Sequence, residues 1–142
     1  MRFWDSSAII PLCLGEPRTQ RLKRLAEEDP GFVAWWATPT ECYAAFARLR
    51  REAVLSRAEE DIARHFTKQL LAEWTEIEPS REVREQAGRV LLLHPLKAAD
   101  TLQLAAALVW ANRNPAGYEF VSLDQRLHDA AHREGLKILP DL

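Results

Sequence analysis

Short apolar runs alternate with longer segments in which apolar residues recur at helical spacing, from one end of the chain to the other. The pattern predicts strands at 2–4, 32–36, 74–78, 118–123 and 136–139. It predicts helices from about residue 8 to Pro17 and over 18–28, 38–52, 56–73, 80–93, 97–113 and 124–135. Strands that alternate with helices are typical of a parallel sheet. We therefore expect one α/β domain over residues 1–142, with a doubly wound, largely parallel five-stranded sheet flanked by helices.

The composition is that of a globular protein and shows no basic excess. Apolar residues make up 47% of the 142 residues, which excludes a disordered chain. The net charge of −2 counts modestly against a nucleic-acid-binding protein. Most of the basic residues are arginine, however, and arginine binds phosphate in a bidentate manner. A local patch, such as the run Arg48, Arg50 and Arg51, could grip phosphate or a protein partner, although a solvated helix face is the more common use of such a run.

Cysteine usage and hydropathy suggest a cytoplasmic protein. Cys13 and Cys42 lie among apolar residues without the spacing of a zinc site, so we interpret both as buried free thiols in a reducing compartment. The longest apolar stretch, 102–111, is too short to span a bilayer. We expect no membrane association.

Acidic residues follow the ends of several predicted strands. Asp5 and Asp124 come after the first and fourth strands, and Glu41 comes shortly after the second. Asp100 lies in the opening turns of the helix that leads into the fourth strand. In an open parallel sheet, ligands bind beyond the carboxyl ends of the strands. Clustered carboxylates repel unless protons or a cation neutralise them, and oxygen ligands suit Mg²⁺ or Mn²⁺ rather than zinc.

Each acid also has a purely structural interpretation. Asp5 and Asp124 could be helix caps, and Glu41 could complete a capping box with Thr38. Asp100 has apolar residues one and two turns away on its helix, so only an ion pair with Lys97, one turn earlier, would explain it structurally. Four acids at one edge of the sheet are harder to explain in this way than any one of them.

Four short motifs together resemble those of PIN-domain nucleases, and most closely the VapC toxins of toxin–antitoxin pairs. They are Asp5-Ser6-Ser7-Ala8, Thr38-Pro39-Thr40-Glu41, Leu96-Lys97-Ala98-Ala99-Asp100 continuing to Leu104-Ala105, and Ser122-Leu123-Asp124. The likeness extends over nearly the whole chain, including Glu16-Pro17 and the last helix ending at Gly135. Order and spacing carry it, because no single motif is specific.

The resemblance implies Mg²⁺- or Mn²⁺-dependent hydrolysis of RNA. It implies that Asp5, Glu41, Asp100 and Asp124 form the metal centre and are catalytic. Ser6 and Ser122 match hydroxyl residues of the family that would support the acids or position substrate. The family also implies a homodimer and a cognate antitoxin whose tail occupies the acidic cleft.

Other interpretations of the sequence compete with this one. His128 and His132 imitate a zinc-hydrolase motif, but Asp129 replaces its glutamate, and we favour surface helix positions for both histidines. The five tryptophans could stack RNA bases, but most fit core or dimer-interface positions. A receiver-like Mg²⁺-binding module would need an acidic pair where Asp5 stands alone. A PIN fold that binds without cutting is the remaining alternative, and the complete acidic set argues against it.

Overall fold

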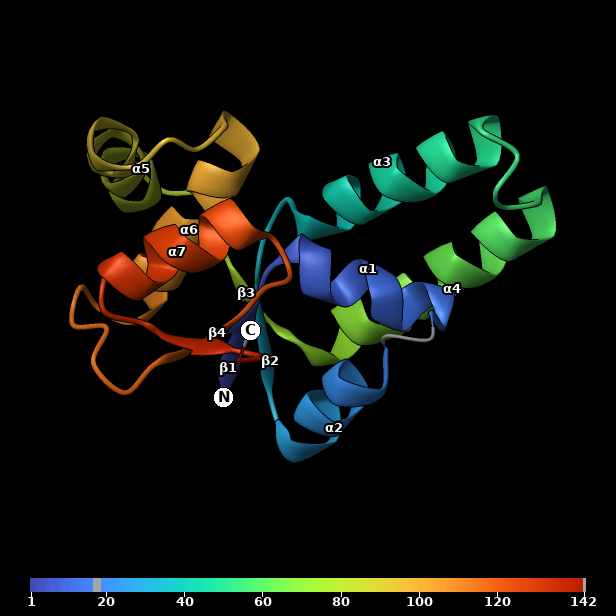
Figure 1. Cartoon of the computed structure of the whole chain (residues 1–142), viewed down its shortest axis with the longest axis horizontal. Coiled ribbons are helices and arrows are strands. Elements are labelled where there is room, and N and C mark those ends of the chain that lie inside the picture. Colours follow the sequence, from blue (N-terminus) through green and yellow to red (C-terminus); the bar gives the residue numbers. More distant parts are fainter. Residues whose placement is uncertain (17–18, 142) are drawn as a thin grey trace.

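Five short strands form one entirely parallel sheet in the order β3-β2-β1-β4-β5 (Figure 1). The computed structural model describes residues 1–16 and 19–141. The strands are β1 (Arg2–Trp4), β2 (Phe32–Trp35), β3 (Thr75–Ile77), β4 (Glu119–Val121) and β5 (Lys137–Leu139). This order differs from the 2-1-3-4-5 order of receiver-like folds, so the receiver-like alternative is wrong.

Helices cover both faces of the sheet, which confirms the doubly wound architecture. In the described part of the chain they are α1 (Ser6–Leu14), α2 (Thr19–Glu28), α3 (Thr38–Arg51), α4 (Arg57–Glu73), α5 (Arg81–Leu93), α6 (Ala98–Trp110) and α7 (Gln125–Arg133). Phe3 packs into the core under α5, α6 and α7, whereas its neighbour Trp4 packs into the core under α1 to α4. Successive strand residues point to opposite faces, so the wholly apolar strand β2 serves both cores.

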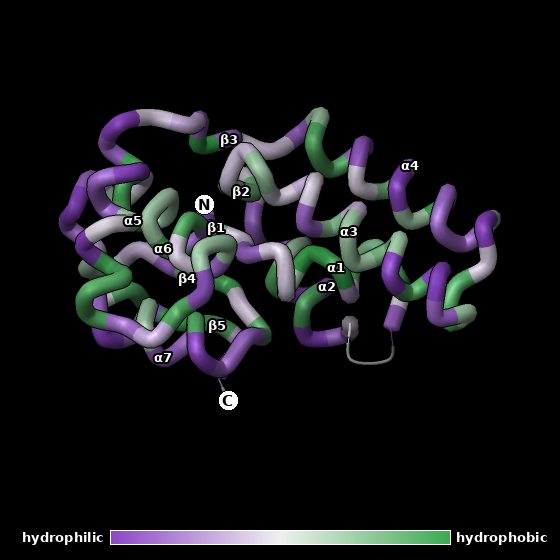
Figure 2. Tube along the Cα trace, turned by 90° about the horizontal axis from the view of Figure 1, so that it is seen from above, coloured by the Kyte–Doolittle hydropathy of each residue, from purple (hydrophilic) through white to green (hydrophobic). Residues whose placement is uncertain are grey.

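Helices α3 and α4 form a hairpin that extends away from the sheet, as two views at right angles show (Figures 1 and 2). Ser56 and Glu59 form a capping box that begins α4, in agreement with the predicted helix over 56–73. Farther along the hairpin, Arg50 on α3 pairs with Glu60 on α4 at 2.7 Å. Arg50 therefore braces the hairpin.

Several predicted boundaries shift by one to three residues. The first helix begins at Ser6 rather than near Ala8, because Asp5 itself caps it by accepting the N–H of Ser7. The predicted start of the second helix at residue 18 lies outside the described residues, which place α2 from Thr19. Strand β2 ends at Trp35, and Trp36 is 53% exposed.

The packing predictions for tryptophan and cysteine are largely confirmed. Three of the tryptophans are buried, namely Trp4, Trp35 and Trp74. Cys13 and Cys42 are both buried and free. Among the described residues, the structure contains no helix with the length and apolar character needed to cross a membrane.

Candidate active site

The starts of α1, α3 and α7 face one another beyond the carboxyl ends of the central strands (Figure 1). Asp5 follows β1 directly and Asp124 follows β4, and these two strands are neighbours in the sheet. Glu41 lies in the first turn of α3 and Asp100 in the first turn of α6. The fold therefore brings acids from distant parts of the sequence to one edge of the sheet.

Asp5 is buried at the centre of a network of hydroxyl groups. Its carboxylate is 1% exposed, and Oδ2 accepts hydrogen bonds from the hydroxyls of Ser7 and Ser122, the latter at 2.9 Å. The same oxygen accepts the backbone N–H of Ser7 at 3.3 Å and so caps α1. The helix cap and the polar network thus share one carboxylate oxygen.

Ser7 and Ser122 connect the start of α1 to the segment between β4 and α7. The Ser7 hydroxyl accepts the backbone N–H of Leu123 at 2.9 Å, and the Ser122 hydroxyl accepts that of Asp124 at 3.1 Å. Ser122 is a predicted site residue, whereas no role in the site was predicted for Ser7. The two hydroxyls orient Asp5 and fix the backbone on either side of Leu123.

Glu41 is not a capping residue, so the capping-box interpretation is wrong. Its backbone N–H already donates to the carbonyl of Ala37, and the N-cap at Ala37 has no side-chain hydrogen bond. The Glu41 carboxylate instead accepts the Ser6 hydroxyl at 3.1 Å and the Gln103 side-chain amide at 2.8 Å. Glu41 is therefore oriented by partners from α1 and α6.

Gln103 contacts the site through Glu41, although it was not predicted as a site residue. It is fully buried on α6, one turn after Asp100, and its Nε2 also donates to the Thr38 hydroxyl at 3.0 Å. Its Oε1 is buried without a hydrogen-bond partner among the described residues. The one available signal was a polar side chain inside the apolar stretch 102–111.

Asp100 and Asp124 complete the set of acids. Asp124 caps α7 by accepting the N–H of Leu127 at 2.9 Å. The pKa of Asp100 is raised, first by partial burial and then by the charge of Asp124, while the charge of Lys97 lowers it. No described ion pair joins Lys97 to Asp100, so Lys97 offsets the repulsion only in part.

Burial and mutual repulsion make the four acids one electrostatic cluster. Burial is the largest cause that raises the pKa of Asp5 to about 6, and the charge of Asp100 adds to it against hydrogen bonds from serine. Burial likewise raises the pKa of Glu41 to about 7, where the Gln103 hydrogen bond opposes it and the charges of Asp5 and Asp100 add to it. A cation or protons would relieve this repulsion.

The donor chemistry fits a hard divalent cation, although the side chains as placed do not form a coordination shell. All candidate donors are oxygens, the preference of Mg²⁺ and Mn²⁺. In residues 1–16 and 19–141, no three acidic, histidine or cysteine side chains are grouped closely enough to hold one metal ion. Metal binding by all four acids therefore stays a prediction that requires side-chain rearrangement.

The histidine pair forms no zinc site. His128 is 2% exposed and its Nε2 lies 3.1 Å from the carbonyl oxygen of Pro140, so the expected surface position is wrong for this residue. His132, one turn later, is exposed as expected. One histidine is engaged in the core and the other faces solvent, which prevents joint coordination.

The protein is thus a doubly wound α/β protein. Its candidate site lies beyond the carboxyl ends of the central strands, where acids from strand ends and helix starts meet. The chain belongs to the PIN domain family, which matches residues 2–133. Ribonucleases VapC45 and VapC49, from two strains of Mycobacterium tuberculosis, are each 26% identical to this chain over 138 residues, which cover 97% of this chain and 94% of theirs.

Solved structures share the fold. FitAcB from Neisseria gonorrhoeae superimposes with a TM-score of 0.71 at 14% identity, covering 99% of this chain and 97% of that one. VapC20 from Mycobacterium tuberculosis, described as a sarcin-ricin loop cleaving toxin, gives 0.66 at 20% identity, covering 92% and 95%. A toxin–antitoxin complex from Klebsiella pneumoniae gives 0.63 at 16% identity, covering 89% and 88%.

Proposed function

We propose that this chain is a metal-dependent endoribonuclease and the toxin of a toxin–antitoxin pair. The observation that carries the proposal is the acidic cluster at the carboxyl end of the sheet, in which burial and mutual repulsion raise the pKa of three carboxyl groups. Such a cluster is costly for stability and is typical of functional sites. Membership of the PIN domain family and the names of the two relatives support hydrolysis of RNA as its use.

In this proposal the four acids hold Mg²⁺ or Mn²⁺, which would activate water and neutralise charge on the phosphoryl oxygens. Asp5 is held by Ser7 and Ser122, so its orientation is set before any substrate arrives. Glu41 is the acid we assign to orient or deprotonate the attacking water, because hydrogen bonds from Ser6 and Gln103 fix its carboxylate at the site. Ser6, which donates to Glu41, keeps that carboxylate beside Asp5.

A cognate antitoxin and a homodimer belong to the same proposal. The acidic cluster would accept a basic tail from the partner, and the toxin–antitoxin complex among the structural neighbours supports an antitoxin as the partner. Co-expression with a small protein encoded beside this chain should yield a complex with suppressed cleavage. Exposed apolar side chains at the end of α5, with Leu92 87% exposed, are consistent with self-association.

Substitution of Asp100 tests the proposed function. The wild type should cleave RNA with Mg²⁺ or Mn²⁺ and not with EDTA. The variant Asp100→Asn should lose cleavage and, without metal, be no less stable, because one repelling charge is gone. Asp61→Asn is the matched control, since Asp61 is exposed on α4, away from the acids.

Opposite results would refute it. If Asp100 only partners Lys97, the variant should keep full cleavage and lose up to about 1 kcal/mol of stability. Cleavage that persists in EDTA would remove the metal from the proposal.

A further inference from the structure

Two arginines near the end of α3, Arg48 and Arg50, differ in whether they have an acidic partner. Arg50 is engaged with Glu60, as described above. Arg48 is exposed, and its guanidinium has no hydrogen bond or ion pair with any described residue. Arg48 follows Glu41 by seven residues, which is two helical turns, so both lie on one face of α3 about 10 Å apart along the axis. Arg48 thus places a positive charge two turns farther along α3 from the acidic site.

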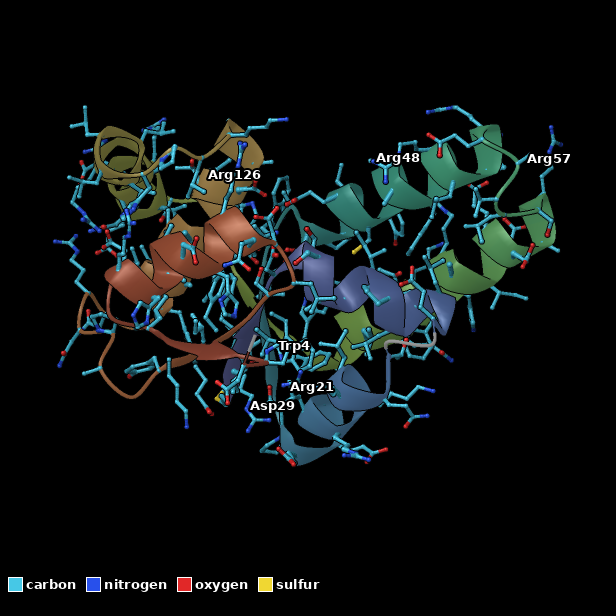
Figure 3. The ribbon with its side chains drawn as sticks, in the orientation of Figure 1. Trp4, Arg21, Asp29, Arg48, Arg57 and Arg126 are labelled. Carbon is cyan, nitrogen blue, oxygen red and sulfur yellow. The ribbon has the colours of Figure 1, made fainter. Side chains whose placement is uncertain are left out.

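Arg126 occupies the corresponding position on the other side of the site. It is the second residue of α7, two positions after Asp124, and it too is exposed without a partner among the described residues. Figure 3 shows Arg126 on α7 and Arg48 on α3 on opposite sides of the starts of these two helices. Glu41 lies in the first turn of α3, and Asp124 is the N-cap of α7.

Neither arginine neutralises the acids. The only basic residue whose charge lowers the pKa of Asp5, Glu41 or Asp100 is Lys97, among the described residues. The guanidinium groups of Arg48 and Arg126 therefore remain available to an anion from outside. A polyanion that approaches four carboxylates is repelled by them and needs cations beside the site to hold it.

We infer that Arg48 and Arg126 bind backbone phosphates of a single RNA strand that lies across the acidic site, one arginine on each side of the bond to be cut. The inference rests on the proposed function and adds the residues that hold the RNA strand at the site. Each guanidinium offers two parallel donors that match two phosphate oxygens. These contacts carry no sequence information, so they position the strand without selecting it. This assignment explains how a chain of net charge −2 can hold RNA.

RNA binding without cleavage tests the inference. The probe is a fluorescein-labelled pool of random single-stranded RNA, titrated in EDTA at several salt concentrations and followed by anisotropy. Each phosphate contact on a single strand contributes about 0.7 to the slope of log K against log salt. The variants Arg48→Gln and Arg126→Gln should each lower that slope by about 0.7, and the double variant by about 1.4. In cleavage assays they should raise KM and leave kcat unchanged.

Arg57→Gln is the matched control, because Arg57 is an exposed arginine at the outer end of the hairpin (Figure 3). It should keep the wild-type slope. An equal decrease of the slope in Arg48→Gln, Arg126→Gln and Arg57→Gln would mean general charge attraction and would overturn the inference. Unchanged slopes, or a wild type that fails to bind the RNA pool at low salt, would also overturn it.

A polyglutamate 20-mer is a second probe. Arginine-dependent binding of that peptide, with RNA binding unaffected, would assign these arginines to an acidic protein segment instead. Failure here leaves the Asp100→Asn cleavage test intact, so the two proposals fail separately.

Discussion

Replacing Asp5 by asparagine should stabilise the metal-free protein at alkaline pH and change little at acid pH. The carboxylate is 1% exposed and its pKa is raised from 3.8 to about 6. Asparagine has the same shape and keeps one oxygen that can accept from Ser7 and Ser122. Its amide nitrogen would stand where Oδ1 now receives only a long contact of 3.5 Å from Ser6.

The magnitude follows from the pKa shift. A rise from 3.8 to about 6 is about 2.2 pH units, and at 1.36 kcal/mol per unit it corresponds to about 3 kcal/mol. Between these two pH values the folded state holds a proton that the unfolded state has lost, so stability falls as pH rises through this window. Above pH 6 the ionised Asp5 carboxylate lowers the free energy of unfolding by the full amount of about 3 kcal/mol, and below pH 3.8 this loss is absent. The stabilisation expected from Asp5→Asn therefore grows between these pH values.

Urea denaturation in EDTA at pH 4 and pH 8 measures the effect, with Asp61→Asn as an exposed control. Asp5→Asn should gain up to about 3 kcal/mol over the wild type at pH 8 and be nearly equal to it at pH 4. The pKa of Glu41 should also fall, because the charge of Asp5 contributes to raising it. A difference between variant and wild type that does not change with pH would refute the reasoning. So would a variant that is less stable than the wild type at pH 8.

Two further predictions concern association and the opposite end of the sheet. Light scattering should report about twice the 16.3 kDa chain mass, and a strict monomer at tens of micromolar would contradict the proposed homodimer. Asp29→Ala should lower the free energy of unfolding by about 1–3 kcal/mol, because it leaves the buried Trp4 indole N–H, now 3.0 Å from the Asp29 carboxylate, without an acceptor. An unchanged urea midpoint would show that the Trp4 hydrogen bond contributes little.

The layout of the fold was predictable because it depends on local patterns. Alternation of strands and helices specified a parallel doubly wound sheet, and the predicted helix caps Asp5 and Asp124 marked helix starts that the structure confirms. Position relative to strand ends also predicted that Asp5 and Asp124 lie at one edge of the sheet, and the structure adds that they follow neighbouring strands. These features depend on residues a few positions apart.

The partners of the acids were not predictable, because they come from remote segments. Gln103 reaches Glu41 across 62 positions, and Ser7 meets Ser122 across 115. A single glutamine in an otherwise apolar helix is usually interpreted as part of a core-facing helix and does not indicate a functional site. A serine after a capping aspartate looks like part of a helix start. Only tertiary structure distinguishes these uses.

Helix capping and metal binding are compatible roles for one aspartate, so the two interpretations of the sequence were not true alternatives. Asp124 caps α7 through Oδ1, and its Oδ2 has no hydrogen bond with any described residue. Asp5 caps α1 through Oδ2, and its Oδ1 has only the long contact with Ser6. A cap contributes about 1 kcal/mol whether or not a ligand is bound, and it fixes the side chain through that oxygen. In the proposed function, the cap would orient each carboxylate in advance and leave its second oxygen for the cation.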